Sequence, residues 1–127
     1  MTNPEIFKAY DIRGIYGADL DEETAYQVAL AYVALRRQDD DYNPSAPIKL
    51  AVGSDMRLSS PLLKEKLIAG LIAAGADVID FGMVSTPAFY FAVASNELSG
   101  GIMISASHNP KEWNGFKLVR AKAVPVS

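Results

Sequence analysis

Near the C-terminal end of the 127-residue chain, a strongly apolar run is followed by a polar stretch whose side chains could take part in a reaction. Residues 102–104 are apolar at every position, as in a strand buried inside an α/β sheet. Ser107 and His108 follow this run after two small residues, Ser105 and Ala106. A serine hydroxyl where a buried strand breaks into a loop can act as a nucleophile or carry a phosphoryl group. Lys117 returns toward the same place after a short connection.

Other interpretations of this stretch stay open on residue types alone. Small polar residues fill most loops, so a Ser107 that merely caps a turn is the commoner outcome. A serine hydrolase is disfavoured, because the residues around Ser107 do not form Gly-x-Ser-x-Gly. His108 is the only histidine, and a sequence neighbour is not an obvious triad base.

Two arginines stand where strands are expected to give way to loops. Arg13 precedes Gly14, so its planar guanidinium could bind a phosphate at a point of close backbone approach, although a surface salt bridge is more common there. Arg57 follows a short apolar strand, and it either binds an anion at the rim of the sheet or pairs with Asp55.

The elements that must position these side chains alternate between strands and helices. Helices are expected over residues 21–37, 60–74 and 88–96, since each has a capping residue or proline at its start and apolar positions at helical spacing. Strands are expected at residues 6–10, 49–54, 77–82, 100–104 and 116–120, with 11–14 as a loop and Asn114-Gly115 as a turn. The connection before the last strand is too short for a helical crossover, so that strand should run antiparallel to its predecessor.

Composition restricts the class of protein. The length favours a single domain over residues 1–127, and half of the residues are apolar, which is enough for a core. Twelve basic against fifteen acidic side chains argue against nucleic-acid binding, and no apolar run is long enough to cross a membrane. The absence of cysteine excludes disulfides and thiolate metal sites and suits a cytoplasmic protein, and the N-terminus lacks the plan of a signal peptide.

Three motifs resemble those of one enzyme family. Ser105-Ala106-Ser107-His108-Asn109-Pro110, followed by Asn114-Gly115-Phe116-Lys117, resembles the active-serine loop of the α-D-phosphohexomutases, which include phosphomannomutase, phosphoglucomutase and phosphoglucosamine mutase. Tyr10-Asp11-Ile12-Arg13-Gly14 resembles the opening motif of the same family, and Val52-Gly53-Ser54-Asp55-Met56-Arg57 resembles its second-strand exit.

The resemblance implies a fold and a set of roles. The fold is a three-layer α/β/α domain with a four-stranded mixed sheet whose last strand is antiparallel. Ser107 carries the phosphoryl group, and His108, Lys117 and Arg13 orient it and assist proton transfer. Substrate or phosphate contacts come from the residues Tyr10, Arg57 and Asn109.

The resemblance also implies a reaction and a metal ion. Phospho-Ser107 donates to a hexose 1- or 6-phosphate, and a hexose bisphosphate is the intermediate and activator. The sugar then turns over and returns the other phosphoryl group to the serine. A Mg²⁺ ion touches the phosphate on Ser107, and its aspartate ligands come from an Asp-Gly-Asp-x-Asp-Arg loop.

The chain departs from the family pattern in what it lacks. It contains no Asp-Gly-Asp-x-Asp-Arg loop, no sugar-selecting Gly-Glu-x-Ser-Gly-His loop and no Arg-x-Ser-Gly-Thr phosphate clamp. We therefore expect a fragment that matches only the first of the family's four domains, is inactive alone, and needs the remaining domains of the same polypeptide as partners. Two alternatives stay open: a phosphoglucosamine mutase domain, and a non-catalytic sugar-phosphate-binding module. Asn114-Gly115-Phe116-Lys117 leans toward the mannose/glucose branch.

Overall fold

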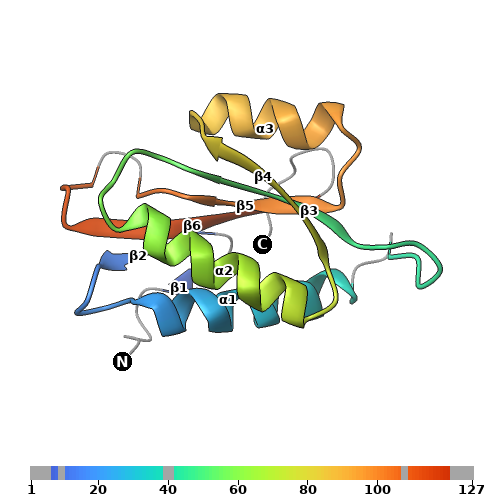
Figure 1. Cartoon of the computed structure of the whole chain (residues 1–127), viewed down its shortest axis with the longest axis horizontal. Coiled ribbons are helices and arrows are strands. Elements are labelled where there is room, and N and C mark those ends of the chain that lie inside the picture. Colours follow the sequence, from blue (N-terminus) through green and yellow to red (C-terminus); the bar gives the residue numbers. More distant parts are fainter. Residues whose placement is uncertain (1–6, 9–10, 39–41, 107–108, 121–127) are drawn as a thin grey trace.

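The computed structural model of the protein describes residues 7–8, 11–38, 42–106 and 109–120. One mixed sheet runs through it, with strand order β1-β2-β6-β5-β3-β4 (Figure 1). The strands are β1 (Phe7–Lys8), β2 (Asp11–Ile15), β3 (Lys49–Ser54), β4 (Asp77–Met83), β5 (Gly100–Ile104) and β6 (Trp113–Arg120). The helices are α1 (Glu22–Arg36), α2 (Ser60–Ala73) and α3 (Thr86–Ser95). No helix within these ranges has the length and apolarity needed to cross a membrane.

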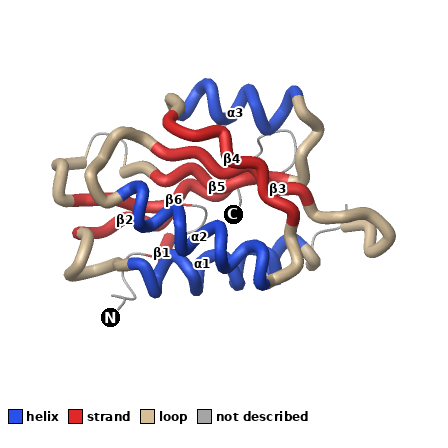
Figure 2. Tube along the Cα trace, viewed as in Figure 1, coloured by secondary structure: helices blue, strands red, loops and turns tan. Residues whose placement is uncertain are grey.

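The helices lie on both faces of the sheet, which confirms the predicted three-layer architecture. Helices α1 and α2 pack side by side on one face, and α3 lies on the other (Figures 1 and 2). The pleat of β3 shows how one strand serves both layers, because successive side chains point to opposite faces. Leu50 and Val52 belong to the core cluster under α1 and α2, whereas Ala51 packs with Phe89 of α3.

The predicted count of four strands is wrong, because the sheet has six strands within the part of the chain that the structure describes. The segment expected to be a loop after residue 10 is β2, which pairs antiparallel with β6, and the two-residue β1 pairs with β2 in turn. Ile12 in β2 is buried in the core opposite Phe116, and this burial decides in favour of a strand. The last strand starts earlier than predicted, since Asn114 and Gly115 lie inside β6 and form no turn.

The strand order favours a crevice at the end of the sheet where the carboxyl ends of β3 and β5 lie. Strand β3 has parallel neighbours on both sides, β4 and β5, and the chain changes direction across the sheet at this point. Ligands of open α/β sheets bind where such a reversal leaves a gap beyond the carboxyl ends of the strands. Strand β6 runs antiparallel to β5, as predicted from the short connection between them. The connections after β3 and β5, which carry the candidate residues, therefore meet at this edge.

The N-terminus of α1 supports a stability prediction. Asp21 is the N-cap: its side chain accepts a hydrogen bond from the Thr24 backbone N–H at 3.0 Å, while the Thr24 hydroxyl accepts from the Asp21 N–H at 3.1 Å. We expect Asp21→Ala to lower the free energy of unfolding by about 1 kcal/mol at neutral pH. Urea denaturation of the 127-residue chain measures it, with the exposed Glu65→Ala as control.

The same cap has a pH signature. The hydrogen bond from the Thr24 backbone lowers the pKa of Asp21 below its ordinary value of 3.8. Because the folded-state pKa is the lower one, the contribution is complete above the unfolded-state pKa and is lost as the pH falls through the folded-state pKa. The stability difference between wild type and Asp21→Ala should therefore shrink in acid, and a difference that stays constant would contradict the capping role.

Candidate active site

The predicted reactive loop connects β5 to β6, and its described flanks are held by backbone hydrogen bonds. The N–H of Ser105 donates to the carbonyl of Gly115 at 2.9 Å, and the N–H of Asn109 donates to the carbonyl of Ala106 at 3.0 Å. Ser105 is buried at the mouth of the loop. Three residues of the predicted site, Ser107, His108 and Tyr10, lie outside the described residues, so their roles stay predictions.

A charged cluster lies on β2 and β6 beside this loop. Asp11 accepts hydrogen bonds from Nε and Nη2 of Arg13 at 3.0 and 2.7 Å, and it lies 3.7 Å from Nζ of Lys117. The sheet explains the grouping: Asp11 and Arg13 share one face of β2, opposite the buried Ile12, and Asp11 is directly across from Lys117 in the register. Two cations and one carboxylate leave the cluster with an excess positive charge.

Asn109 links the charged cluster to the loop. Its side-chain oxygen accepts a hydrogen bond from Nη1 of Arg13 at 2.9 Å. This contact joins residues far apart in the sequence, and it brings together three of the predicted site residues: Arg13, Asn109 and Lys117. Their proximity is what the predicted site requires, because a phosphoryl group held on the loop would need cations within reach.

Arg57 is the second arginine at this edge, and it pairs with Asp55. Its Nε donates to Oδ2 of Asp55 at 3.0 Å, and its Nη1 and Nη2 donate to backbone carbonyls of the reactive loop and of the first residue of β6. Its side chain is only 12% exposed. Of the two alternatives left open by the sequence, the ion pair with Asp55 is present, and phosphate contact by Arg57 stays a prediction.

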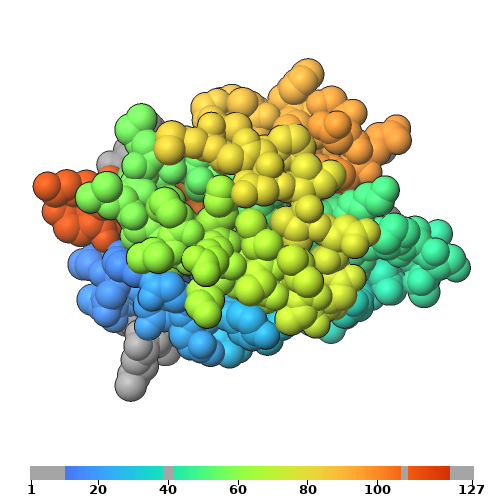
Figure 3. Space-filling view, viewed as in Figure 1, coloured from blue at the N-terminus to red at the C-terminus, as the bar shows by residue number. Residues whose placement is uncertain are grey.

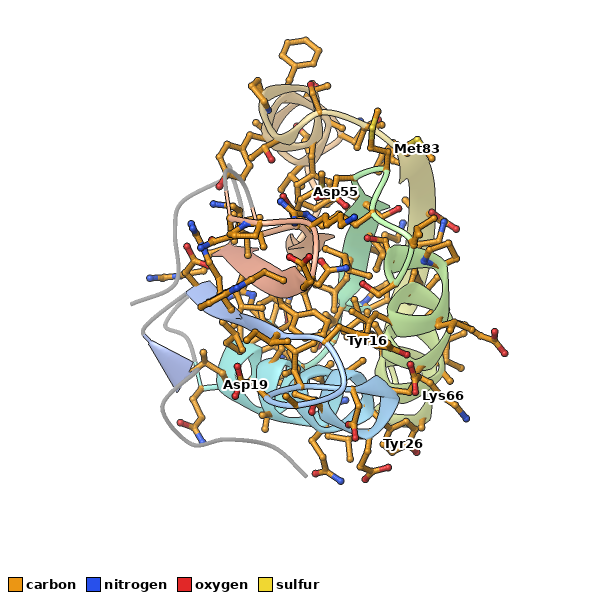
Figure 4. All side chains as sticks on the ribbon, turned by 90° about the vertical axis from the view of Figure 1, so that its left-hand side faces the viewer. Tyr16, Asp19, Tyr26, Asp55, Lys66 and Met83 are labelled. Carbon is orange, nitrogen blue, oxygen red and sulfur yellow. The ribbon has the colours of Figure 1, made fainter. Side chains whose placement is uncertain are left out.

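A pocket of about 1090 Å³ opens beside these groups. Its size slightly exceeds the range of about 300–1,000 Å³ that is usual for small-molecule sites. The β3–α2 connection, the start of α3 and the reactive loop form its walls, and Figure 4 shows Asp55 and Met83 at this end of the molecule. In Figure 3 the segments after β3 and before β6 reach the same left-hand edge. The lining residues are Asp55, Met56, Arg57, Leu58, Thr86, Pro87, Ser105, Asn109, Lys111 and Glu112.

A family model decides the relationship of this chain to known proteins. The model described as phosphoglucomutase/phosphomannomutase, alpha/beta/alpha domain I, matches residues 4–127. The chain belongs to this phosphoglucomutase/phosphomannomutase family. It corresponds to domain I, and the family predicted from the three motifs is thereby confirmed.

Individual phosphoglucomutase/phosphomannomutase relatives agree with this assignment. A phosphomannomutase of Escherichia coli is 45% identical over the whole chain, and one of Klebsiella pneumoniae is 44% identical. A solved family protein of Burkholderia thailandensis superposes with a TM-score of 0.85 at 38% identity over the whole chain. The chain spans 26% of the E. coli relative, 75% of the K. pneumoniae relative and 28% of the B. thailandensis structure.

The described part of this phosphohexomutase domain offers no set of metal ligands. It contains no group of three or more histidine, cysteine, aspartate or glutamate side chains that could hold an ion. Asp11, the carboxylate of the charged cluster, is occupied by Arg13 and Lys117. The residues described here therefore do not make a Mg²⁺ site by themselves, and a Mg²⁺ at the phosphate of Ser107 stays a proposal whose carboxylate ligands lie outside this chain.

Tyr16 lies at the same end of the domain but is unsuited to proton transfer (Figure 4). Its hydroxyl donates a hydrogen bond to the Glu22 carboxylate. This bond, together with burial and the negative charge nearby, raises the pKa of Tyr16 to about 12. The phenol therefore stays protonated at neutral pH.

Several residues that organise the site were missed by sequence reasoning. Asp11 was seen only as part of a motif, although it holds both Arg13 and Lys117. Asn114 was interpreted as a turn residue, yet its buried amide donates to the hydroxyls of Ser59 and Ser60 at 2.7 and 3.0 Å. No local pattern marks these roles, because each depends on a partner brought close by the fold.

Proposed function

We propose that this chain is the active-serine domain of a phosphomannomutase/phosphoglucomutase, which in the full-length protein interconverts hexose 1-phosphates and hexose 6-phosphates. Family membership supports the class of enzyme. The observation that carries the proposal is the contact between Arg13 and Asn109, with Lys117 in the same charged cluster, next to the loop that contains Ser107. The missing domains would supply the rest of the site.

The charge of the cluster suits a phosphoserine. A serine phosphate carries between about 1.5 and 2 negative charges near neutral pH. Arg13 and Lys117 together exceed the single charge of Asp11, so the cluster attracts such a group while Asp11 fixes the directions of both cations. Phosphoryl transfer depends mostly on positioning and on stabilising charge spread over the phosphoryl oxygens, which is what these side chains provide.

The proposed reaction moves one phosphoryl group at a time. The bond between phosphorus and Oγ of phospho-Ser107 breaks, and a bond from phosphorus to a hydroxyl oxygen of the hexose phosphate forms. The proton of that hydroxyl passes through groups of the site to Oγ, which leaves a free serine and a hexose bisphosphate. After the sugar turns over, its other phosphoryl group returns to Oγ. His108 and Lys117 assist these proton transfers, and Tyr10 and Asn109 contact substrate or phosphate. Mg²⁺ supplies additional positive charge when bound.

The full-length protein provides the test. With Mg²⁺ and a trace of hexose bisphosphate, it should interconvert mannose 1- and 6-phosphate and glucose 1- and 6-phosphate, whereas residues 1–127 alone should show no turnover. Preference for glucosamine 1-phosphate would instead assign the phosphoglucosamine branch. Tight binding of hexose phosphates without turnover by the full-length protein would favour a sugar-phosphate-binding module and contradict the proposal.

A further inference from the structure

We propose that Arg57 is a positioning residue that, together with Asp55, clamps the backbone from Asn109 onward, two residues after the reactive serine. The inference rests on the proposed function, since it concerns the loop that carries Ser107. It assigns Arg57 a task different from phosphate binding. The clamp would fix where the serine hydroxyl stands relative to the cations of β2 and β6.

The first observation is the direction of the Arg57 hydrogen bonds. Nη1 donates to the carbonyls of Pro110 and Trp113 at 2.7 and 3.1 Å, and Nη2 donates to the carbonyl of Asn109 at 3.0 Å. Of these carbonyls, those of Asn109 and Pro110 belong to the irregular segment in front of β6, and that of Trp113 belongs to the first residue of the strand. One planar guanidinium, with its fork of N–H groups, gathers three of them and so sets the shape of the segment.

The second observation is that Asp55 anchors the clamp to the sheet. Its Oδ2 accepts from Nε of Arg57 at 3.0 Å, and its Oδ1 accepts from the Arg57 backbone N–H at 3.1 Å. The Asp55 backbone N–H in turn donates to the carbonyl of Ile104, the last residue of β5, at 3.0 Å. The guanidinium is thus oriented by a carboxylate that is itself tied to the strand leading into the reactive loop.

The third observation is that Ser60 connects Asp55 to Asn114 of β6 through hydrogen bonds. The hydroxyl of Ser60 donates to Oδ1 of Asp55 at 2.9 Å, and Ser60 accepts from the amide of Asn114 at 3.0 Å. Both residues are fully buried, and Asn114 stands at the start of β6, directly after the clamped segment. Arg57 and Asn114 therefore hold that segment from both sides through the β3–α2 connection.

The same contacts separate Arg57 from the phosphate-binding candidates. Each of its three side-chain nitrogens already donates to an acceptor within the protein. Arg13 also donates from all three side-chain nitrogens, but to the side chains of Asp11 and Asn109, and its side chain is 33% exposed against 12% for Arg57. A guanidinium committed to the backbone controls geometry, and misplacing a reacting group by about 1 Å can cost about 100-fold in rate.

The test uses the full-length protein with Arg57→Met, which keeps an apolar side chain of similar length and removes the donors. We expect kcat to fall about 100-fold with KM nearly unchanged. Hydrogen exchange of the amides between residues 109 and 114 should become at least about tenfold faster, while β3 keeps its protection. The matched control is Lys64→Met on α2, which breaks a surface ion pair with Asp80 and should alter neither quantity.

Ser60→Ala is a second, milder variant at a residue that does not line the pocket. It tests the proposed clamp if Arg57→Met fails to fold. It should change kcat and loop exchange in the same direction by a smaller factor. A rise in KM with unchanged loop exchange in Arg57→Met would overturn the proposal and assign Arg57 to phosphate binding. If the wild type shows no mutase activity, the proposed function fails. The clamp is then judged by hydrogen exchange of the amides between residues 109 and 114: faster exchange in both variants supports it, and unchanged exchange in both refutes it.

Discussion

The full-length protein with Ser107→Ala is expected to lose hexose-phosphate interconversion by at least about 10⁴-fold, the scale seen when an enzyme loses its covalent nucleophile. Alanine cannot accept the phosphoryl group, so neither half of the proposed reaction can start. The substitution removes a single oxygen atom, so folding should be little affected. A coupled assay of glucose 1-phosphate conversion at saturating hexose bisphosphate measures the loss.

A serine remote from the pocket provides the matched control. Ser45 lies in the exposed loop before β3, and its described hydrogen bond is made by its backbone N–H to the Asn43 side chain. Ser45→Ala should leave the rate unchanged. A Ser107→Ala protein that keeps a tenth or more of the wild-type rate would show that the phosphoryl group travels by another route.

Gly115→Ala is expected to destabilise the domain by about 3 kcal/mol, the upper end of ordinary overpacking costs. Gly115 lies in β6 across from Arg13, and a Cβ added there would stand 2.1 Å from the carbonyl oxygen of Ile12 and 3.0 Å from Cα of Arg13. Backbone atoms of a paired strand cannot yield as a flexible side chain would, so β2 must move away. Urea denaturation of the 127-residue chain measures the change.

Gly17→Ala separates this clash from the general cost of replacing a glycine. Gly17 has φ +89°, but nothing lies within 4 Å of an added Cβ. We expect it to cost about 1 kcal/mol, from backbone strain alone. Equal losses for the two variants would mean that the close approach of β2 and β6 at Gly115 is not a constraint, and the placement of Arg13 beside the loop would lose its structural basis.

The sequence predicted the parallel part of the sheet well, because its signals are local. Strand β3 has the predicted bounds, and helix α2 ends one residue before the predicted end, since apolar runs, proline and glycine mark such elements directly. Strand β2 was missed for a different reason. It is only five residues long and contains two charged residues and a glycine, so by itself it resembles a loop. Its pairing with β6, which buries Ile12, is a long-range effect.

The candidate site likewise has residues that could be predicted from local motifs and residues that could not. Motifs pointed to Arg13, Asn109 and Lys117, and the fold brings these three side chains to one place. The groups that hold them could not be predicted, because Asp11 meets Lys117 only through the register of β2 and β6, and Asn114 meets Ser60 only where β6 passes α2.

The most direct measurement is a phosphopeptide map of the full-length protein after incubation with a hexose bisphosphate. The account predicts one added phosphoryl group, located on Ser107, which disappears when the protein is then given hexose monophosphate in excess. A protein that turns over substrate with no phosphate on Ser107, or that carries its phosphate at another residue, would contradict it.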